Sequence, residues 1–160
     1  MKKIRNLLLV ITLLLSITLI TGCSTDNDSS SDKTIGLGET FTFDDLEITL
    51  ENNISFTKID NEFSDYNGQD VVRLPITVKN IKDETHSLNM FYYSIYGSKG
   101  TQLSTVSSYF DDSVDFAGDL RSGASYTKNL YFLYDGNGKY AIEFNEVWGP
   151  KTTIEFDVTK

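Results

Sequence analysis

The chain has 160 residues, which predicts a single domain. Charged residues make up 23% of it and hydrophobic residues 39%, which is a globular composition. Its single Cys excludes an internal disulfide and a cysteine zinc cluster. The formal net charge of −9 argues against a nucleic-acid partner, because phosphate binding needs clustered Lys and Arg.

The N-terminus has the organisation of a secretory signal. Three basic residues lie within the first five positions, and the stretch Leu7–Ile20 that follows carries no charge. This stretch suits the apolar part of a signal peptide and is shorter than the about 20 apolar residues of a membrane-spanning helix. Small residues then lead to Gly22 and the lone Cys23. The alternatives are an uncleaved anchor, or an ordinary signal peptide followed by a chance Cys.

The segment Leu19-Ile20-Thr21-Gly22-Cys23 resembles the lipobox of bacterial lipoproteins. That resemblance implies cleavage of the bond between Gly22 and Cys23 and attachment of a diacylglyceryl group to the Cys23 thiol. Residues 1–22 are then a signal peptide, and a palmitate-type anchor holds the protein at the extracellular face of the cell membrane. Two acyl chains give stable anchoring, whereas one binds a membrane only marginally.

Residues 23–34 are predicted to be the lipidated Cys and a flexible tether. The stretch Ser24–Thr34 contains no apolar residue and consists mostly of Ser, Asp, Asn and Thr, so nothing in it can bury. Without the basic leader the net charge becomes −12. Anionic headgroups repel such a chain, so we expect the lipid alone to hold it at the membrane.

A period of two in the hydrophobic residues predicts a β domain over residues 35–160. Apolar and polar side chains alternate around residues 46–50, 72–78, 140–144 and 154–158, and less clearly at 129–133. Further short strands are expected at Phe41–Phe43, Phe91–Tyr96 and Ser104–Tyr109. Turn residues separate the runs and no helical stretch stands out, which predicts an all-β sandwich or barrel.

Pro75 interrupts the most regular of these alternating runs. Proline has no N–H for a β-ladder, so it belongs at a sheet edge, at a position with no partner, or at a bulge. Because the alternation is regular on both sides of Pro75, we expect a local bulge there.

Several local motifs occur in a fixed order behind the lipobox. They are Gly36-Leu37-Gly38-Glu39, the run Pro75–Glu84 with Val78-Lys79-Asn80 inside it, and Leu120–Ser125. This order resembles the immunoglobulin-like domain of uncharacterised Gram-positive lipoproteins, which belongs with the mycobacterial secreted immunoprotective antigens in the telokin-like class. The resemblance implies an immunoglobulin-like antiparallel β-sandwich of about 7–9 strands, an extracellular location and no catalytic residues. The chain departs from the pattern at Pro75 and at Arg121-Ser122, where the family usually has a Pro.

Catalytic and metal motifs are weak in this sequence. His86, the only His, is expected to be exposed in a turn, and neither a nucleophile elbow nor a phosphate-binding loop occurs. Asp111, Asp112 and Asp115 could offer oxygens to Ca²⁺, but Phe116 replaces the required Gly, so a solvated loop is the preferred interpretation. No carboxylate pair suitable for glycoside hydrolysis stands out.

Aromatic residues supply the candidate interaction surface. Tyr92 and Tyr96 fall in one expected strand that carries aromatic residues on both faces, Tyr109 lies near an irregular stretch, and Trp148 is next to Gly149-Pro150. Tyr is favoured at interfaces. The alternative is that these side chains belong to the core or pack under loops.

The sequence therefore favours a membrane-anchored, extracellular, non-enzymatic module that binds a protein or a cell-wall partner. No cofactor is predicted. A small-ligand or Ca²⁺-binding accessory lipoprotein is the alternative, followed by an envelope hydrolase.

Overall fold

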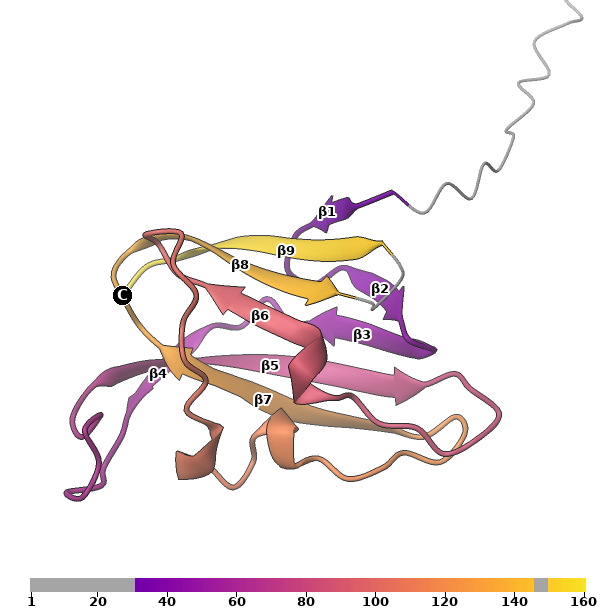
Figure 1. The fold of residues 1–160 in the computed structure, drawn as a ribbon, viewed down its shortest axis with the longest axis horizontal. Helices are drawn as coiled ribbons and strands as arrows, with labels where there is room; N and C mark the ends of the chain where they lie inside the picture. The colour runs from indigo at the N-terminus through magenta and orange to yellow at the C-terminus, as the bar shows by residue number, and fades with distance from the viewer. Residues whose placement is uncertain (1–30, 146–149) are drawn as a thin grey trace, which may run out of the picture.

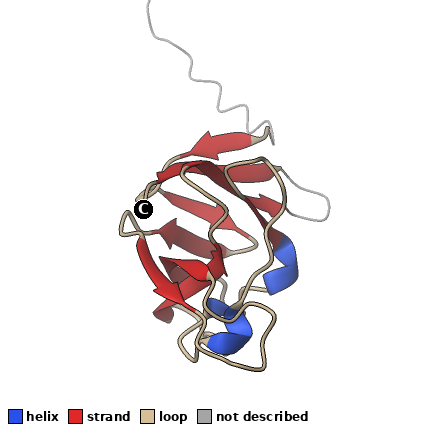
Figure 2. Ribbon diagram, turned by 90° about the vertical axis from the view of Figure 1, so that its left-hand side faces the viewer, coloured by secondary structure: helices blue, strands red, loops and turns tan. Residues whose placement is uncertain are grey.

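Two β-sheets packed face to face make up the protein (Figures 1 and 2). A computed structural model describes residues 31–145 and 150–160, so Gly22, Cys23 and Trp148 lie outside the described residues. The described chain contains nine strands and three short 3-10 helices, which confirms the predicted all-β sandwich. No helix within the described ranges has the length and apolarity needed to cross a membrane.

The first sheet has four strands in the order β1-β9-β8-β6. Their bounds are β1 Lys33–Ile35, β6 Tyr93–Tyr96, β8 Gly138–Asn145 and β9 Lys151–Val158. β1 pairs in parallel with β9, and the other pairs are antiparallel. The sandwich therefore includes the end of the predicted tether, because Lys33 and Thr34 pair with β9 and Asp32 Oδ1 accepts a hydrogen bond from the Lys151 N–H at 3.0 Å.

The second sheet has five strands built around the long strand β5. Their bounds are β2 Thr40–Phe43, β3 Leu46–Leu50, β4 Ser55–Lys58, β5 Asp70–Asn80 and β7 Ser125–Leu133. β7 pairs with β5 along one side over nine residue pairs, while β3 and β4 follow each other along its other side. The 3-10 helices are η1 Met90–Tyr92, η2 Ser107–Tyr109 and η3 Val114–Phe116.

Pro75 occupies the gap between β3 and β4 on the side of β5. The pairing with β7 runs through Pro75 opposite Asn129 without an extra residue, so the predicted bulge is wrong. On the other side β3 stops at Leu50, opposite Ile76, and β4 starts at Ser55. The Pro75 carbonyl still accepts a hydrogen bond from the Glu51 N–H at 2.9 Å. The missing N–H therefore falls where no strand needs it.

The core lies between the sheets and is rich in aromatic rings. Phe144 meets Phe41 and Phe43 edge-on, with ring centroids 5.1 and 5.5 Å apart. Tyr140 and Phe132 are also fully buried. The predicted strand at Ser104–Tyr109 is wrong: Thr105 forms one bridge to Phe132, and η2 follows.

Asn80 joins the end of β5 to two loops. Its side chain is fully buried, and Nδ2 donates to the carbonyls of Glu84 at 2.7 Å and Leu120 at 2.9 Å. Its Oδ1 accepts from the Lys82 N–H at 2.8 Å. The Asn of the Val78-Lys79-Asn80 motif therefore satisfies three backbone groups inside the protein, which only an amide of this length can do.

We expect Asn80→Asp to lower the free energy of unfolding by about 3 kcal/mol, because a carboxylate cannot donate to the two carbonyls. Urea denaturation of the purified protein measures this change. Asn53→Asp is the matched control, since Asn53 is exposed in a turn. Equal loss of stability in both variants would contradict the assigned role of Asn80.

Candidate binding sites

Strand β6 is the edge of the first sheet, and only part of that edge is covered. β6 pairs with β8 on its inner side over Tyr93–Tyr96. On its outer side the Ile95 carbonyl accepts from the Leu103 N–H at 2.8 Å, and Gly97 N–H donates to the Thr101 carbonyl at 3.0 Å. The segment after β6 thus folds back and covers the C-terminal half of the edge.

The segment that covers β6 leaves this strand after Leu103, because the chain then crosses to the other sheet. The Val106 N–H donates to the Tyr131 carbonyl of β7 at 3.0 Å, which pulls this segment away from β6. Consequently the Ile95 N–H and the Tyr93 carbonyl have no backbone partner among the residues that the structure describes. These groups form a short, unpaired open edge. Tyr93 is 7% and Ile95 1% exposed, so another extended chain can pair with this edge once the side chains above it move aside.

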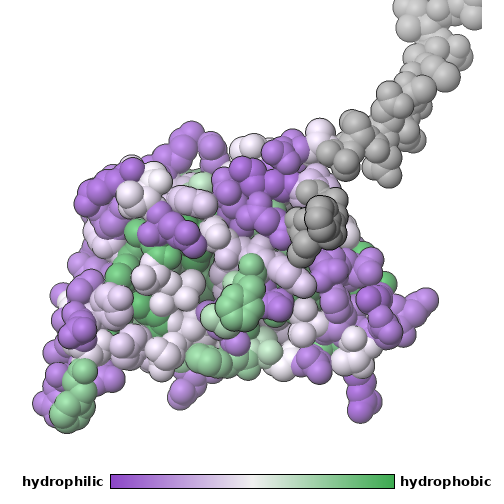
Figure 3. Space-filling model, in the orientation of Figure 1, coloured by the Kyte–Doolittle hydropathy of each residue, from purple (hydrophilic) through white to green (hydrophobic). Residues whose placement is uncertain are grey.

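A groove of about 560 Å³ runs along this open edge. Phe91 is 85% exposed beside it, and Met90 is 44% exposed. The Asn89 side chain accepts a hydrogen bond from the Phe91 N–H at 2.9 Å and so fixes the turn that presents both residues. Figure 3 shows hydrophobic side chains protruding over η1. None of the described residues that line the groove is charged: Met90, Phe91, Tyr93, Ser94, Ile95, Gln102, Leu103, Ser104 and Thr105.

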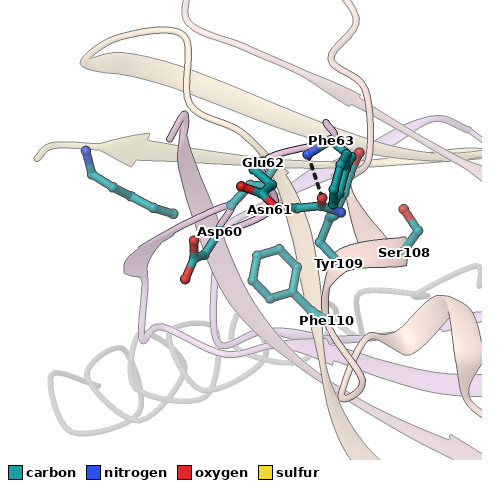
Figure 4. Close-up of a pocket in the computed structure, with 9 residues that line it drawn as sticks. Asp60, Asn61, Glu62, Phe63, Ser108, Tyr109 and Phe110 are labelled. Atoms are coloured by element: carbon teal, nitrogen blue, oxygen red, sulfur yellow. Dashed lines mark hydrogen bonds between the residues drawn. The ribbon is translucent and has the colours of Figure 1, made fainter. Parts of the chain in front are cut away.

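A second pocket, of about 620 Å³, lies beside the loop of residues 59–69, between β4 and β5 (Figure 4). Phe63, near the tip of this loop, is 92% exposed. Tyr109 and Phe110 contribute aromatic surface from the segment around η2. The lining is Lys58, Ile59, Asp60, Asn61, Glu62, Phe63, Ser108, Tyr109 and Phe110.

The aromatic residues singled out from the sequence do not gather at one place. Tyr92 is half-buried with its ring edge-on to Phe43 at 6.0 Å, and Tyr109 donates to or accepts from the Ser64 hydroxyl at 2.7 Å. Tyr96 is half-buried opposite Gln102. Tyr92 and Tyr109 thus pack against the two hydrophobic clusters.

More exposed are Phe63, which the sequence analysis did not select, and Phe91, which it placed in the same expected strand as Tyr92 and Tyr96. The sequence around these two residues does not indicate their exposure, since an aromatic residue beside a strand is usually buried.

Protein donors already occupy two of the three candidate carboxylates of the acidic loop, those of Asp112 and Asp115. Asp112 accepts from Tyr131 Oη and Asn129 Nδ2, both at 2.7 Å, and lies 3.3 Å from Arg73 Nη2. Burial acts to raise the pKa of Asp112, but the hydrogen bond from Tyr131, the charge of Arg73 and the hydrogen bond from Asn129 outweigh it and lower that pKa. Asp111, next along the chain, is exposed.

Asp115 turns inward instead. It accepts hydrogen bonds from the hydroxyls of Tyr93 and Ser107, and burial together with this carboxylate raises the pKa of Tyr93. Asp112 and Asp115 therefore serve as acceptors for different parts of the fold. Within the described ranges no three metal-ligating side chains are placed to share an ion.

His86 is half-buried and does not lie exposed in a turn, so that expectation is wrong. Its Nε2 donates to the Asp44 carbonyl at 2.7 Å and lies 3.2 Å from Asp44 Oδ2. Asp44 and Asp45 have positive φ values of 47° and 57°, as the tight turn between β2 and β3 requires. His86 thus fastens this turn, and it lines neither pocket described above.

A family profile described as "Domain of unknown function (DUF4352)" matches residues 35–154. No curated protein matches the chain. The similarity to a known family therefore covers most of the sandwich without naming an activity.

Three solved structures show the same fold. The putative lipoprotein ycdA of Bacillus subtilis is 18% identical with a TM-score of 0.55, and the match covers 74% of this chain and 38% of that one. An uncharacterized β-sandwich protein of Clostridium difficile is 16% identical with a TM-score of 0.51, covering 79% and 95%. The secreted protein MPT63 of Mycobacterium tuberculosis is 15% identical with a TM-score of 0.54, covering 81% and 100%. At these identities the likeness shows the fold alone, and it agrees with the expected resemblance to mycobacterial secreted antigens.

We expect Asp112→Asn to lower the free energy of unfolding by about 1 kcal/mol at pH 7, because the variant loses a half-exposed charge that three groups stabilise. The lowered pKa means that this stabilisation is present above the unfolded pKa of about 3.9 and is lost as the pH falls through the folded value. The difference in stability between wild type and variant should therefore be smaller at pH 3 than at pH 7. Asp111→Asn, the exposed neighbour, is the control, and a difference between wild type and Asp112→Asn that is as large at pH 3 as at pH 7 would contradict this account.

Proposed function

Because the chain belongs to the DUF4352 family of domains of unknown function, we propose its function from its own surface and its N-terminus. It is a lipid-anchored, non-enzymatic module at the extracellular face of the cell membrane of a Gram-positive bacterium. It binds an extended segment of a partner protein along the open edge of β6.

The sequence supports the anchor. The basic start, the apolar stretch and the small residues before Cys23 stand in the order that lipid attachment requires. One structural relative is described as a putative lipoprotein and another as a secreted protein, which agrees with export. In this proposal residues 1–22 are removed and Cys23 carries the lipid.

The open edge of β6 is the observation that carries the binding role. An unpaired N–H and carbonyl at a sheet edge are satisfied best by another strand, and many recognition domains bind peptides in this way. Exposed edges are usually protected by charge, proline or a covering loop. Here the cover ends at Leu103, and the outward groups of Tyr93 and Ile95 face a groove.

The lining of the groove indicates the chemistry of the partner. Phe91 and Met90 offer apolar contact at one end, and Ser94, Ser104 and Thr105 offer hydroxyls, with no charge among the described lining residues. A charged segment would lose its hydration here without gaining an opposite charge. The partner segment is therefore extended, uncharged and partly apolar.

The position of β6 suits a tethered protein. β1, through which the tether joins the domain, is at one edge of the first sheet, and β6 is at the other. The edge next to the tether is thus separated from the binding edge by β9 and β8.

We expect Cys23→Ala to abolish incorporation of labelled palmitate and to leave the leader uncleaved, because the variant lacks the thiol that accepts the lipid. Metabolic labelling and the mass of the purified protein measure both effects. Ser24→Ala, at the next position, should be labelled and cleaved like the wild type. Normal cleavage of Cys23→Ala would contradict lipid attachment and favour an ordinary signal peptide.

We expect a photo-crosslinking residue, p-benzoylphenylalanine, at position 91 in intact cells to capture one segment of one partner. A synthetic peptide of that segment should then slow hydrogen exchange of the Ile95 amide in the full-length protein, because the peptide backbone would accept from that N–H. The same crosslinker at position 63 is the control. Capture of unrelated segments, or binding without protection of Ile95, would overturn strand pairing.

We expect Ser104→Glu to weaken binding of that peptide by more than about tenfold, because it places an unpaired charge in the uncharged groove. Thr42→Glu is the matched control, since Thr42 is exposed on β2 and the variant has the same net charge. Equal affinities of the two variants would contradict the position of the site.

A further inference from the structure

We infer that the pocket beside loop 59–69 binds a neutral oligosaccharide. This site is separate from the β6 edge, and binding at it requires neither the lipid anchor nor strand pairing. It accounts for the exposure of Phe63, which nothing in the packing of the fold requires.

The loop holds its shape through its own hydrogen bonds. The Asn61 N–H donates to Asn67 Oδ1 at 3.0 Å, and Asn61 Oδ1 in turn accepts from the Phe63 N–H at 3.0 Å. At the base of the loop the Gly68 N–H donates to the Ile59 carbonyl at 2.8 Å. Phe63 is therefore presented by an ordered turn, so little conformational entropy is lost when a ligand binds to it.

The aromatic floor of the pocket is fixed as well. Phe110 stacks on Tyr131 with the ring centroids 4.0 Å apart, and the Tyr109 hydroxyl is hydrogen-bonded to Ser64 at 2.7 Å. Figure 4 shows Phe63, Tyr109 and Phe110 around the same hollow. The C–H groups on one face of a sugar ring carry partial positive charge and pack against the negative face of an aromatic ring.

Polar groups lie beside this aromatic surface. Asp60, Asn61 and Glu62 follow one another along the loop, and Ser108 stands on the opposite wall. Neither Asp60 nor Glu62 has an ion-pair partner in the part of the chain that the structure describes. Free carboxylates accept strong hydrogen bonds from sugar hydroxyls. Aromatic faces next to such acceptors match the two kinds of surface on a sugar.

Charge disfavours an anionic ligand. Lys58 is the single basic side chain among the nine described residues of the lining, and it lies 3.7 Å from Asp70 Oδ1. The two carboxylates therefore dominate the local field, which repels phosphate-bearing polymers and acidic sugars. The volume of about 620 Å³ falls within the about 300–1,000 Å³ typical of ligand sites, which suits a short oligosaccharide.

The pocket also faces a suitable direction. In Figure 1 the loop between β4 and β5 lies at the lower left, at the opposite end of the molecule from β1. A domain attached through β1 thus presents this pocket away from the attachment point, toward material outside the membrane.

The test is a titration of the full-length protein, in a detergent without a sugar headgroup, with the neutral oligosaccharides chitotetraose and cellotetraose. Isothermal calorimetry should detect binding of at least one of them. Phe63→Ala should weaken it about three- to tenfold, because one stacking face is lost. Glu62→Gln should also weaken it, because the amide is a poorer acceptor than the carboxylate. Phe116→Ala is the matched control, because Phe116 is an exposed aromatic residue that lines neither pocket, and this variant should bind like the wild type.

Three results would overturn the inference. They are the absence of binding to both oligosaccharides, unchanged affinity in Phe63→Ala, and binding of a lysine heptapeptide in place of the sugars, which would indicate a basic protein ligand. Phe63 and Glu62 are exposed, so loss of folding should not obscure these outcomes, and the thermal unfolding midpoint of each variant checks this. Capture through position 91 tests the other site independently.

Discussion

Strand β5 is the constraint on which the rest of the sandwich depends. Its inward side chains are fully buried, and three other strands find their register from it. β3 and β4 divide one side of β5 at Pro75, and the ladder of β4 leads directly into loop 59–69. At the other end Asn80 fixes the two loops that follow. The positions of loop 59–69 and of the two loops held by Asn80 thus both depend on β5. The alternation of apolar and polar residues in the sequence predicts this strand.

Alternation predicted the strands that have one buried face. It was least clear at β7, and the structure gives the reason: Leu130, Tyr131 and Phe132 are all buried, because the segment that contains Val106 covers the outer face of β7. That same segment was predicted to be a strand, yet it joins the sheet through only a single bridge, between Thr105 and Phe132. A pattern in one segment cannot show which other segment will cover it. The binding sites depend on such covering, so they could be predicted less well than the fold.

Some charged side chains that were expected to be solvated are hydrogen-bonded within the protein, and some aromatic side chains that would be expected to be buried are exposed. The acidic loop was expected to be solvated, but Asp112 and Asp115 accept hydrogen bonds from donors distant in sequence. His86 likewise fastens a hairpin turn 42 residues away. Phe63 and Phe91, whose residue type predicts burial, are held outward by short turns. Only the three-dimensional arrangement reveals which polar groups are used internally and which apolar groups remain free to bind.

The parallel pairing of β1 with β9 has a mechanical consequence for a tethered protein. β1 contributes three residue pairs and lies at the outermost position of its sheet, so tension applied from the N-terminus loads this short ladder before any other. If it detaches, the seven residues from 33 to 39 lengthen the connection by at most about 25 Å, at roughly 3.3–3.6 Å per residue. The remaining eight described strands, the β6 groove and the pocket of loop 59–69 all lie outside that stretch. Under load the connection would therefore lengthen by a limited amount while the two candidate binding sites keep their structure.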